Sequence, residues 1–221
     1  MSQSTKHFTY FSLSALTIYF WYILALSPVV TLSSCSKTLP PVDTIIKPID
    51  TAALLNYQPM TTGSTWYYAG NASGFGVTFN LFCTDRDTTL MDSKVYRVYD
   101  NDYNPKYSEY HRIEDTFNYW SIVPLSTNKT PLLILKSNAK IGERWIGAVN
   151  GSDTYIHQMI SKNIDYKVDS FTYKNVIHVY QTRINTSNDT NFRSNIYFAA
   201  GIGVVHITGE LELKLIKAVI K

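Results

Sequence analysis

From about Leu55 to the end of the chain, short segments rich in β-branched and aromatic residues alternate with clusters of turn formers. Typical segments are FGVTFNLFC (75–83) and NVIHVYQTRI (175–184), and typical turns are DNDYNP and NTSND. Val, Ile, Tyr and Phe suit the pleated, half-buried surface of a strand, whereas Gly, Pro, Asn and Asp favour turns. This regular pattern predicts an all-β fold, a single antiparallel sheet that is strongly curved or closed into a barrel.

Two segments show which faces we expect to be buried. In STWYYAG (64–70), Trp66 and Tyr68 share one face of the strand and Tyr67 lies on the other. We expect Trp66 and Tyr68 to fill the core or one end of a barrel, and a direct contact with a ligand is the alternative. The last segment, LELKLIKAV (211–219), alternates leucines with polar residues, although its residues are also good helix formers.

The charge balance argues against nucleic acid as a partner. The chain has 20 Lys and Arg against 17 Asp and Glu, a net charge of +3, with no basic run. Nucleic-acid binding needs clustered side chains that neutralise phosphates. The histidines have no metal-ligand spacing, and Cys83 has no cysteine near it. We therefore expect no metal site and no cofactor.

Enzymatic motifs are also missing from the sequence. It contains neither a Gly-x-Ser-x-Gly nucleophile elbow nor a phosphate-cradling loop. The remaining candidates are Glu109 and Glu114, which would have to face each other at roughly 5 to 9.5 Å to hydrolyse a glycoside. We expect a protein that is not an enzyme, with a hydrolase built on these carboxylates as the least favoured alternative.

The N-terminal segment has the three parts of an export signal. Lys6 precedes a charge-free stretch over residues 8–30, and the small residues Ser33 and Ser34 come directly before Cys35. The sequence LSSC resembles the lipobox of bacterial lipoproteins. Cleavage between Ser34 and Cys35 would leave Cys35 as the lipidated first residue of the mature protein. Two or three acyl chains hold a protein stably, since each buried methylene contributes about 0.8 kcal/mol.

Two other interpretations of this segment stay open. The apolar stretch is long enough to span a bilayer as an uncleaved signal anchor. Alternatively, ordinary cleavage would leave Cys35 free to form a disulfide with Cys83, the only other cysteine. If Cys35 carries lipid, Cys83 is a lone thiol, and we expect it to be buried in its strand.

The chain divides into three parts under the lipoprotein interpretation. Residues 1–34 are the signal peptide, residues 35–54 a proline-bearing tether, and residues 55–221 one β domain. In Bacteroidota lipoproteins an acidic run after the cysteine is associated with surface display. Ser36 and Lys37 follow Cys35 instead. We therefore expect the protein in the outer membrane, lipid-anchored and facing the periplasm.

Three stretches carry a resemblance to known sequences. GSTWYY (63–68), DSFTYKNVIHV (169–179) and NIYFAAGIGVVHI (195–207) resemble, in the same order, motifs of a group of Bacteroidota lipoproteins of unknown function. Phe171 departs from the group, which usually has glycine at this expected tight turn. These lipoproteins look similar to the curved-sheet lipoprotein carriers of the periplasm, which enclose an apolar cavity.

The resemblance implies binding rather than catalysis. The expected ligand is small and apolar or amphipathic, held within the curved sheet. The alternative is a structural or interaction protein that docks onto an envelope protein or a glycan through an aromatic-rich face.

Overall fold

The computed structural model describes residues 55–72, 75–102, 108–122, 130–185, 187 and 190–221. These residues form twelve strands and no helix, in one antiparallel sheet, which confirms the predicted all-β class. The strands are β1 (Thr65–Ala72), β2 (Phe75–Thr89), β3 (Val95–Asn101), β4 (Glu109–Glu114), β5 (Asn118–Ile122), β6 (Leu132–Lys136), β7 (Arg144–Asn150), β8 (Asp153–Val168), β9 (Phe171–Ile184), β10 (Thr190–Ala199), β11 (Gly203–Gly209) and β12 (Leu211–Val219).

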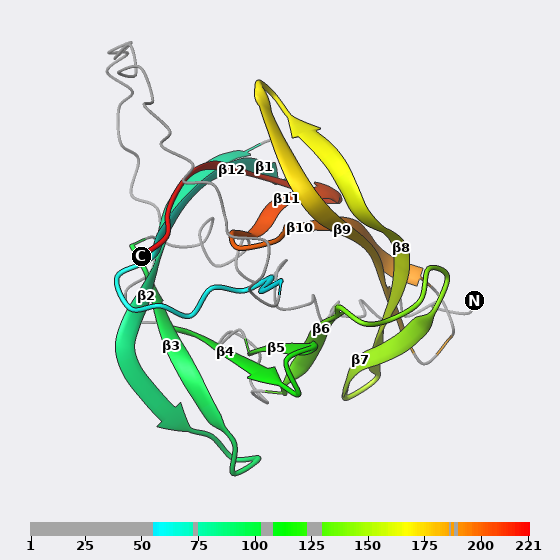
Figure 1. Cartoon of the computed structure of the whole chain (residues 1–221). Helices are drawn as coiled ribbons and strands as arrows, with labels where there is room; N and C mark the ends of the chain where they lie inside the picture. Colours follow the sequence, from blue (N-terminus) through cyan, green and yellow to red (C-terminus); the bar gives the residue numbers. More distant parts are fainter. Residues whose placement is uncertain (1–54, 73–74, 103–107, 123–129, 186, 188–189) are drawn as a thin grey trace, which may run out of the picture.

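The sheet is nearly closed into a barrel. Its strand order runs from β6 back to β1, then to β12 and down to β7, so the first and last strands pair at its centre. The sheet ends, β6 and β7, come together at a seam that completes the ring seen in Figure 1. Across this seam the indole N–H of Trp145 donates to the carbonyl of Leu133 at 3.1 Å. No ladder pairing joins β6 to β7 among the described residues.

Alternation along the strands sorts side chains into the core as predicted. Trp66 and Tyr68 are 1% and 6% exposed, whereas Tyr67 is half-buried. The segment 211–219 is a strand and not a helix, with Leu213 and Leu215 buried. The segment is a strand because it pairs with β1 at the centre of the sheet. There its backbone N–H and C=O groups form hydrogen bonds with neighbouring strands.

The segment that leads into β1 runs into the ring rather than over its surface (Figure 1). Tyr57 is 3% exposed, and its N–H donates to the hydroxyl of Tyr119 at 3.2 Å. The carbonyl of Asn56 accepts from Gly201 at 2.6 Å, and the carbonyl of Pro59 accepts from the Tyr99 hydroxyl at 2.7 Å. Residues 55–60 therefore close one end of the barrel over its aromatic core.

The hairpin β8–β9 extends beyond its neighbours and bends over strands β10 to β12. At its tip, Asp169 accepts from Lys214 of β12 at 3.1 Å. The ring of Tyr166 stacks on Tyr197 of β10 with centroids 3.8 Å apart, and its hydroxyl lies 2.8 Å from Nδ1 of His206 on β11. These contacts hold the hairpin against the outer face of the sheet.

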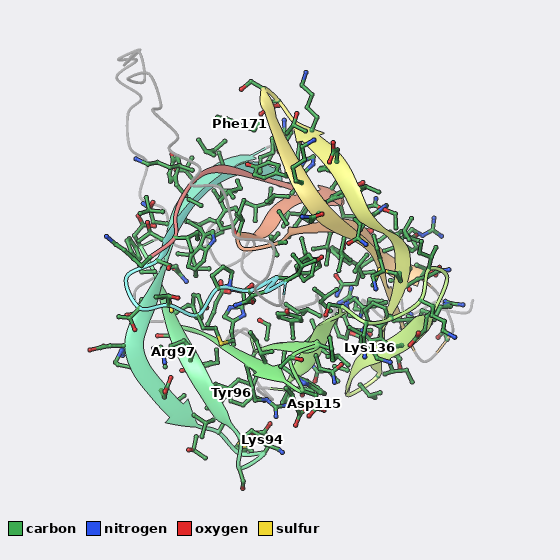
Figure 2. The ribbon with its side chains drawn as sticks, in the orientation of Figure 1. Lys94, Tyr96, Arg97, Asp115, Lys136 and Phe171 are labelled. Carbon is green, nitrogen blue, oxygen red and sulfur yellow. The ribbon has the colours of Figure 1, made fainter. Side chains whose placement is uncertain are left out.

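The bend of this hairpin has a local cause. Strand β8 is continuous, but its pairing with β9 shifts register between Met159 and Tyr166. Asn163 and Asn175, on the two arms, have positive φ, a conformation that asparagine tolerates. The tip turn carries its positive φ at Asp169, so Phe171 already belongs to β9 (Figure 2) and no glycine is needed there.

The polar stretch CTDRD (83–87) continues β2 as a strand, although two aspartates around Arg86 are a composition typical of a solvated turn. Its pairing with β3 shifts register between Cys83 and Asp87, so a bulge, not a turn, accommodates the polar residues. Arg97 of β3 lies 2.7 Å from the carboxylate of Asp87 and donates to the carbonyl of Thr84 in the bulge at 3.1 Å.

Candidate functional site: a polar belt inside the barrel

The residues of the predicted lipidation and cleavage site, Ser34 and Cys35, lie outside the described residues. So does the whole charge-free stretch before them. Within the part of the chain that the structure describes, no helix is long and apolar enough to cross a membrane. The anchor therefore remains a prediction from the sequence.

Trp66 and Tyr68 lie in the core, where the protein itself satisfies their polar atoms. The indole N–H of Trp66 donates to the carbonyl of Ile202 at 2.6 Å, and the hydroxyl of Tyr68 donates to the carbonyl of Val204 at 3.0 Å. Ile202 lies in the turn between β10 and β11, and Val204 lies at the start of β11, which is separated from β1 by β12. These side chains thus join β1 to the β10–β11 turn.

Cys83 is 2% exposed, which confirms the predicted buried strand thiol. Burial is the main cause of the raised pKa of this thiol. A buried, protonated thiol is a poor nucleophile, since the thiolate is the reactive form. We therefore assign Cys83 no chemistry.

Glu109 and Glu114 do not form a carboxylate pair. They are five positions apart on β4, and no register shift interrupts this strand, so they point to opposite faces of the sheet. Glu109 contacts His111 at 3.2 Å, while Glu114 contacts Arg112 at 3.1 Å. Within the described ranges, no three His, Cys, Asp or Glu side chains come together as metal ligands could.

The arrangement that the sequence analysis missed is a set of buried polar residues on three adjacent strands. We call it the inner polar belt. All its members are less than 9% exposed and alternate with outward-facing residues: Asp153 and His157 on β8, Gln181 and Arg183 on β9, and Ser194 on β10.

The strand register places these residues together. His157 pairs with Gln181, which pairs in turn with Ser194, so the three form one row across the sheet. Along β8, His157 has the same parity as Met159, a core residue that is 0% exposed. The belt therefore faces the barrel interior. This shared parity was the signal in the sequence that could have revealed it.

Most of the belt is internally satisfied. The hydroxyl of Ser194 donates to the side-chain oxygen of Gln181 at 3.1 Å. The guanidinium of Arg183 lies 3.5 Å from the carboxylate of Asp153, with both side chains buried. Opposite charges at this distance cancel each other's field in the interior. This pair gives the belt no net charge.

In His157 both polar side-chain atoms are unpaired. The side chain is 0% exposed, and neither ring nitrogen has a hydrogen-bond partner among the residues that the structure describes. Its ring stacks on Trp145, with centroids 5.5 Å apart and planes 14° apart. Gly147 leaves it room, because a Cβ there would lie 2.4 Å from the imidazole Cε1. Each buried polar group left unpaired costs about 1–3 kcal/mol.

Comparison with known proteins gives no assignment. No family model matches the chain, and neither a curated protein nor a solved structure is significantly similar to it. The function must therefore be inferred from the barrel and its inner polar belt.

The buried imidazole makes the fold sensitive to acid. Burial lowers the pKa of His157 from 6.5 to about 3. Between these pH values the unfolded chain binds a proton that the folded chain excludes, so stability falls as the pH falls. From pH 6.5 to 4.5 we expect the wild type to lose about 2 kcal/mol more than His157→Phe.

Urea unfolding of both proteins at the two pH values checks this expectation. Taking the difference between the proteins removes the contributions of the carboxylates and of the other histidines. The same loss in both proteins would show that His157 is accessible to protons in the folded state.

Proposed function

We propose that this chain is a lipid-anchored protein of the bacterial envelope that binds a small amphipathic ligand inside its barrel. It belongs, on this proposal, to the Bacteroidota lipoproteins that its sequence resembles. Cys35 carries the lipid, and the domain faces the periplasm from the outer membrane. The protein performs no catalysis. The observation that carries the proposal is the inner polar belt within a barrel interior that is otherwise lined mainly by apolar and aromatic side chains.

The belt is costly for a protein that only needs to fold. Replacing a buried ion pair by well-packed apolar residues is often neutral or stabilising. A buried histidine with both nitrogens unpaired adds a further penalty. Departures of this kind from an apolar core are expected where a protein binds something. A few polar groups within an apolar enclosure are also the usual composition of a small-molecule site.

The competing function, docking through an aromatic-rich face, has less support. None of the twelve described tyrosines is exposed, and seven of them are buried in the interior or beneath other side chains. Their rings contribute mainly to packing, as in the stack of Tyr166 on Tyr197. The exposed aromatic rings of the described residues are Phe75 and Phe82 on β2 and Phe117 between β4 and β5, and these do not form a tyrosine-rich surface.

The test is a comparison of two masses of one preparation. The protein is extracted from its own membranes in mild detergent, and its mass is measured under native and then denaturing conditions. We expect the native mass to exceed the denatured mass by one small amphiphile, because denaturation releases the bound molecule and keeps the acyl chains on Cys35. Equal masses would contradict ligand binding without affecting the proposed anchor.

A further inference from the structure

The outer face of β7 to β9 carries a group of aliphatic side chains. Ile146 and Val149 on β7 are 62% and 58% exposed. The strand register places them opposite Ile156 and Thr154 on β8, and Thr154 pairs in turn with Ile184 on β9. These positions alternate with the inward-facing residues of the inner polar belt. We call Ile146, Val149, Ile156 and Ile184 the outer apolar patch.

The patch lies at the end of the hairpin β8–β9 that is away from its tip. The tip packs over β10 to β12 through Tyr166 and Asp169. The other end, which carries the patch, stays in the ring beside β7 (Figure 1). An exposed apolar surface that is rimmed by polar residues marks an interaction site for a protein or a membrane. The charges of the rim therefore indicate which occupant fits.

Two exposed arginines lie at the rim of the patch. Arg144 precedes Ile146 by two positions on β7 and shares its outward face. Arg193 of β10 pairs with Thr182, which pairs with Ile156, so it lies in one row with the patch. Neither arginine has a carboxylate partner within the described part of the chain, whereas the other described arginines do: Arg86, Arg97, Arg112 and Arg183.

The carboxylates near this rim do not neutralise it. Glu143 precedes the first of these arginines, but Lys136 already binds its carboxylate at 2.9 Å. Glu210 lies beside Arg193, to whose carbonyl its backbone N–H donates at 3.4 Å. The exposed Lys140 adds a further positive charge just before β7. The rim of the patch therefore has a net positive charge.

Other exposed apolar side chains have acidic neighbours instead. Met91, in the turn between β2 and β3, is 89% exposed and precedes Asp92. Phe82 on β2 is 37% exposed and lies opposite Asp100 of β3. A negative charge beside an apolar side chain disfavours contact with an anionic surface, whereas the arginines of the patch favour it.

From this charge pattern we infer that the outer apolar patch rests on a bilayer leaflet that contains anionic phospholipid. The aliphatic side chains enter the interface, and Arg144 and Arg193 lie at the headgroup phosphates. Long basic side chains can lie along apolar surface and still keep their charge at the headgroups. A lipid leaflet is the occupant that matches both the apolar patch and its positive rim.

The contact orients the domain and does not retain it. The patch exposes fewer apolar groups than a single acyl chain, and one acyl chain alone already holds a protein only weakly. The inference therefore rests on the lipid anchor of the proposed function, because Cys35 has to hold the domain beside the leaflet. It adds the face of the barrel that is turned toward the membrane.

The experiment reads the contact at one position of the lipidated full chain, extracted from its own membranes. Thr154→Cys is labelled with an environment-sensitive fluorophore, since Thr154 lies between Val149 and Ile184. Buried Cys83 stays unlabelled. The protein is added to phosphatidylcholine vesicles with or without phosphatidylglycerol, and both contain a lipid that is spin-labelled on its acyl chain. We expect strong quenching with phosphatidylglycerol and little without it.

A second label and added salt control this measurement. The fluorophore on Met91→Cys, at the acidic turn between β2 and β3, should be quenched little in either vesicle. Raising the salt to about 1 M should reduce the quenching at position 154, because the Debye length then falls to about 3 Å.

Substitutions assign the contact to the patch and its rim. Arg144→Gln with Arg193→Gln should lower the ratio of docked to undocked protein about thirtyfold, as expected for two basic side chains at an anionic surface. Lys167→Gln with Lys217→Gln removes the same charge from exposed positions elsewhere and should change little. Ile146→Ser with Val149→Ser should lower the ratio about tenfold. All these side chains except the half-exposed ones are at the surface, so the barrel should fold in each variant.

Each outcome supports or overturns the inference. Equal quenching of the two labels, or equal effects of the arginine and lysine pairs, overturns it and leaves the proposed function in place. A fluorescence rise that depends on protein density and not on spin-labelled lipid overturns it in favour of a second copy of this chain. An intact mass without acyl chains overturns both the inference and the anchor of the proposed function.

Discussion

Gly70→Ala should destabilise the barrel by about 2–4 kcal/mol, although it adds a single methyl group. Gly70 lies in β1 opposite Leu213 of β12. A Cβ at this position would lie 2.1 Å from the carbonyl oxygen of Glu212 and 3.0 Å from the Cα of Leu213. Both are backbone atoms, so the clash cannot be relieved by turning a side chain and must separate the two strands.

The pairing of β1 with β12 is what makes this position sensitive. It joins the two halves of the strand order, since β1 leads to β6 and β12 leads to β7. Separation of the strands would open the barrel opposite its seam. Gly70 has no positive φ, so the close approach of two backbones explains its requirement.

Urea unfolding of the substituted proteins measures this effect. Gly76→Ala is the matched control, because Gly76 lies in the adjacent strand β2, has no positive φ and has no atom within 4 Å of a built Cβ. This control should leave stability unchanged or raise it by up to about 1 kcal/mol, since alanine reduces the entropy of the unfolded chain. Equal midpoints for the two variants would contradict the backbone clash.

The fold class could be predicted because strand patterns are local. Trp66, Tyr68 and the leucines of β12 show alternation within a few residues, and pairing in a sheet preserves it. The hairpin that bends over the sheet could not be predicted, since its contacts join Tyr166 to residues 31 and 40 positions away, Tyr197 and His206. Residues 55–60, which close one end of the barrel, also depend on partners far away in the sequence, namely Tyr99, Tyr119 and Gly201.

The site was missed for a different physical reason. His157 looks like an ordinary strand histidine, and the sequence gives its parity but not what fills the space around it. Only the register of three strands shows that His157, Gln181 and Ser194 form one row facing inward. Whether its nitrogens find partners is likewise a property of packing. The sequence indicated candidate carboxylates instead, and β4 places these on opposite faces.

Cys35→Ser should release essentially all of the protein from the membrane fraction. A serine hydroxyl cannot form the thioether that carries the diacylglycerol, so the anchor would be lost. Each buried methylene contributes about 0.8 kcal/mol, so two or three acyl chains attach the protein stably to the membrane. Without acyl chains this attachment is lost. Fractionation followed by immunoblotting measures the effect. Cys83→Ser is the control, because a thiol buried in β2 has no part in anchoring.

The intact mass of the wild type, extracted from its own membranes, separates the three interpretations of the N-terminal segment. A mass equal to that of residues 35–221 plus two or three acyl chains would establish Cys35 as the anchor. A full-length chain without lipid indicates a signal anchor, and then Cys35→Ser would leave the protein in the membrane. A cleaved chain two hydrogens lighter than its dithiol form indicates a Cys35–Cys83 disulfide. In that case the wild type itself is not retained by the membrane, and a ligand for the barrel would have to be sought away from the bilayer.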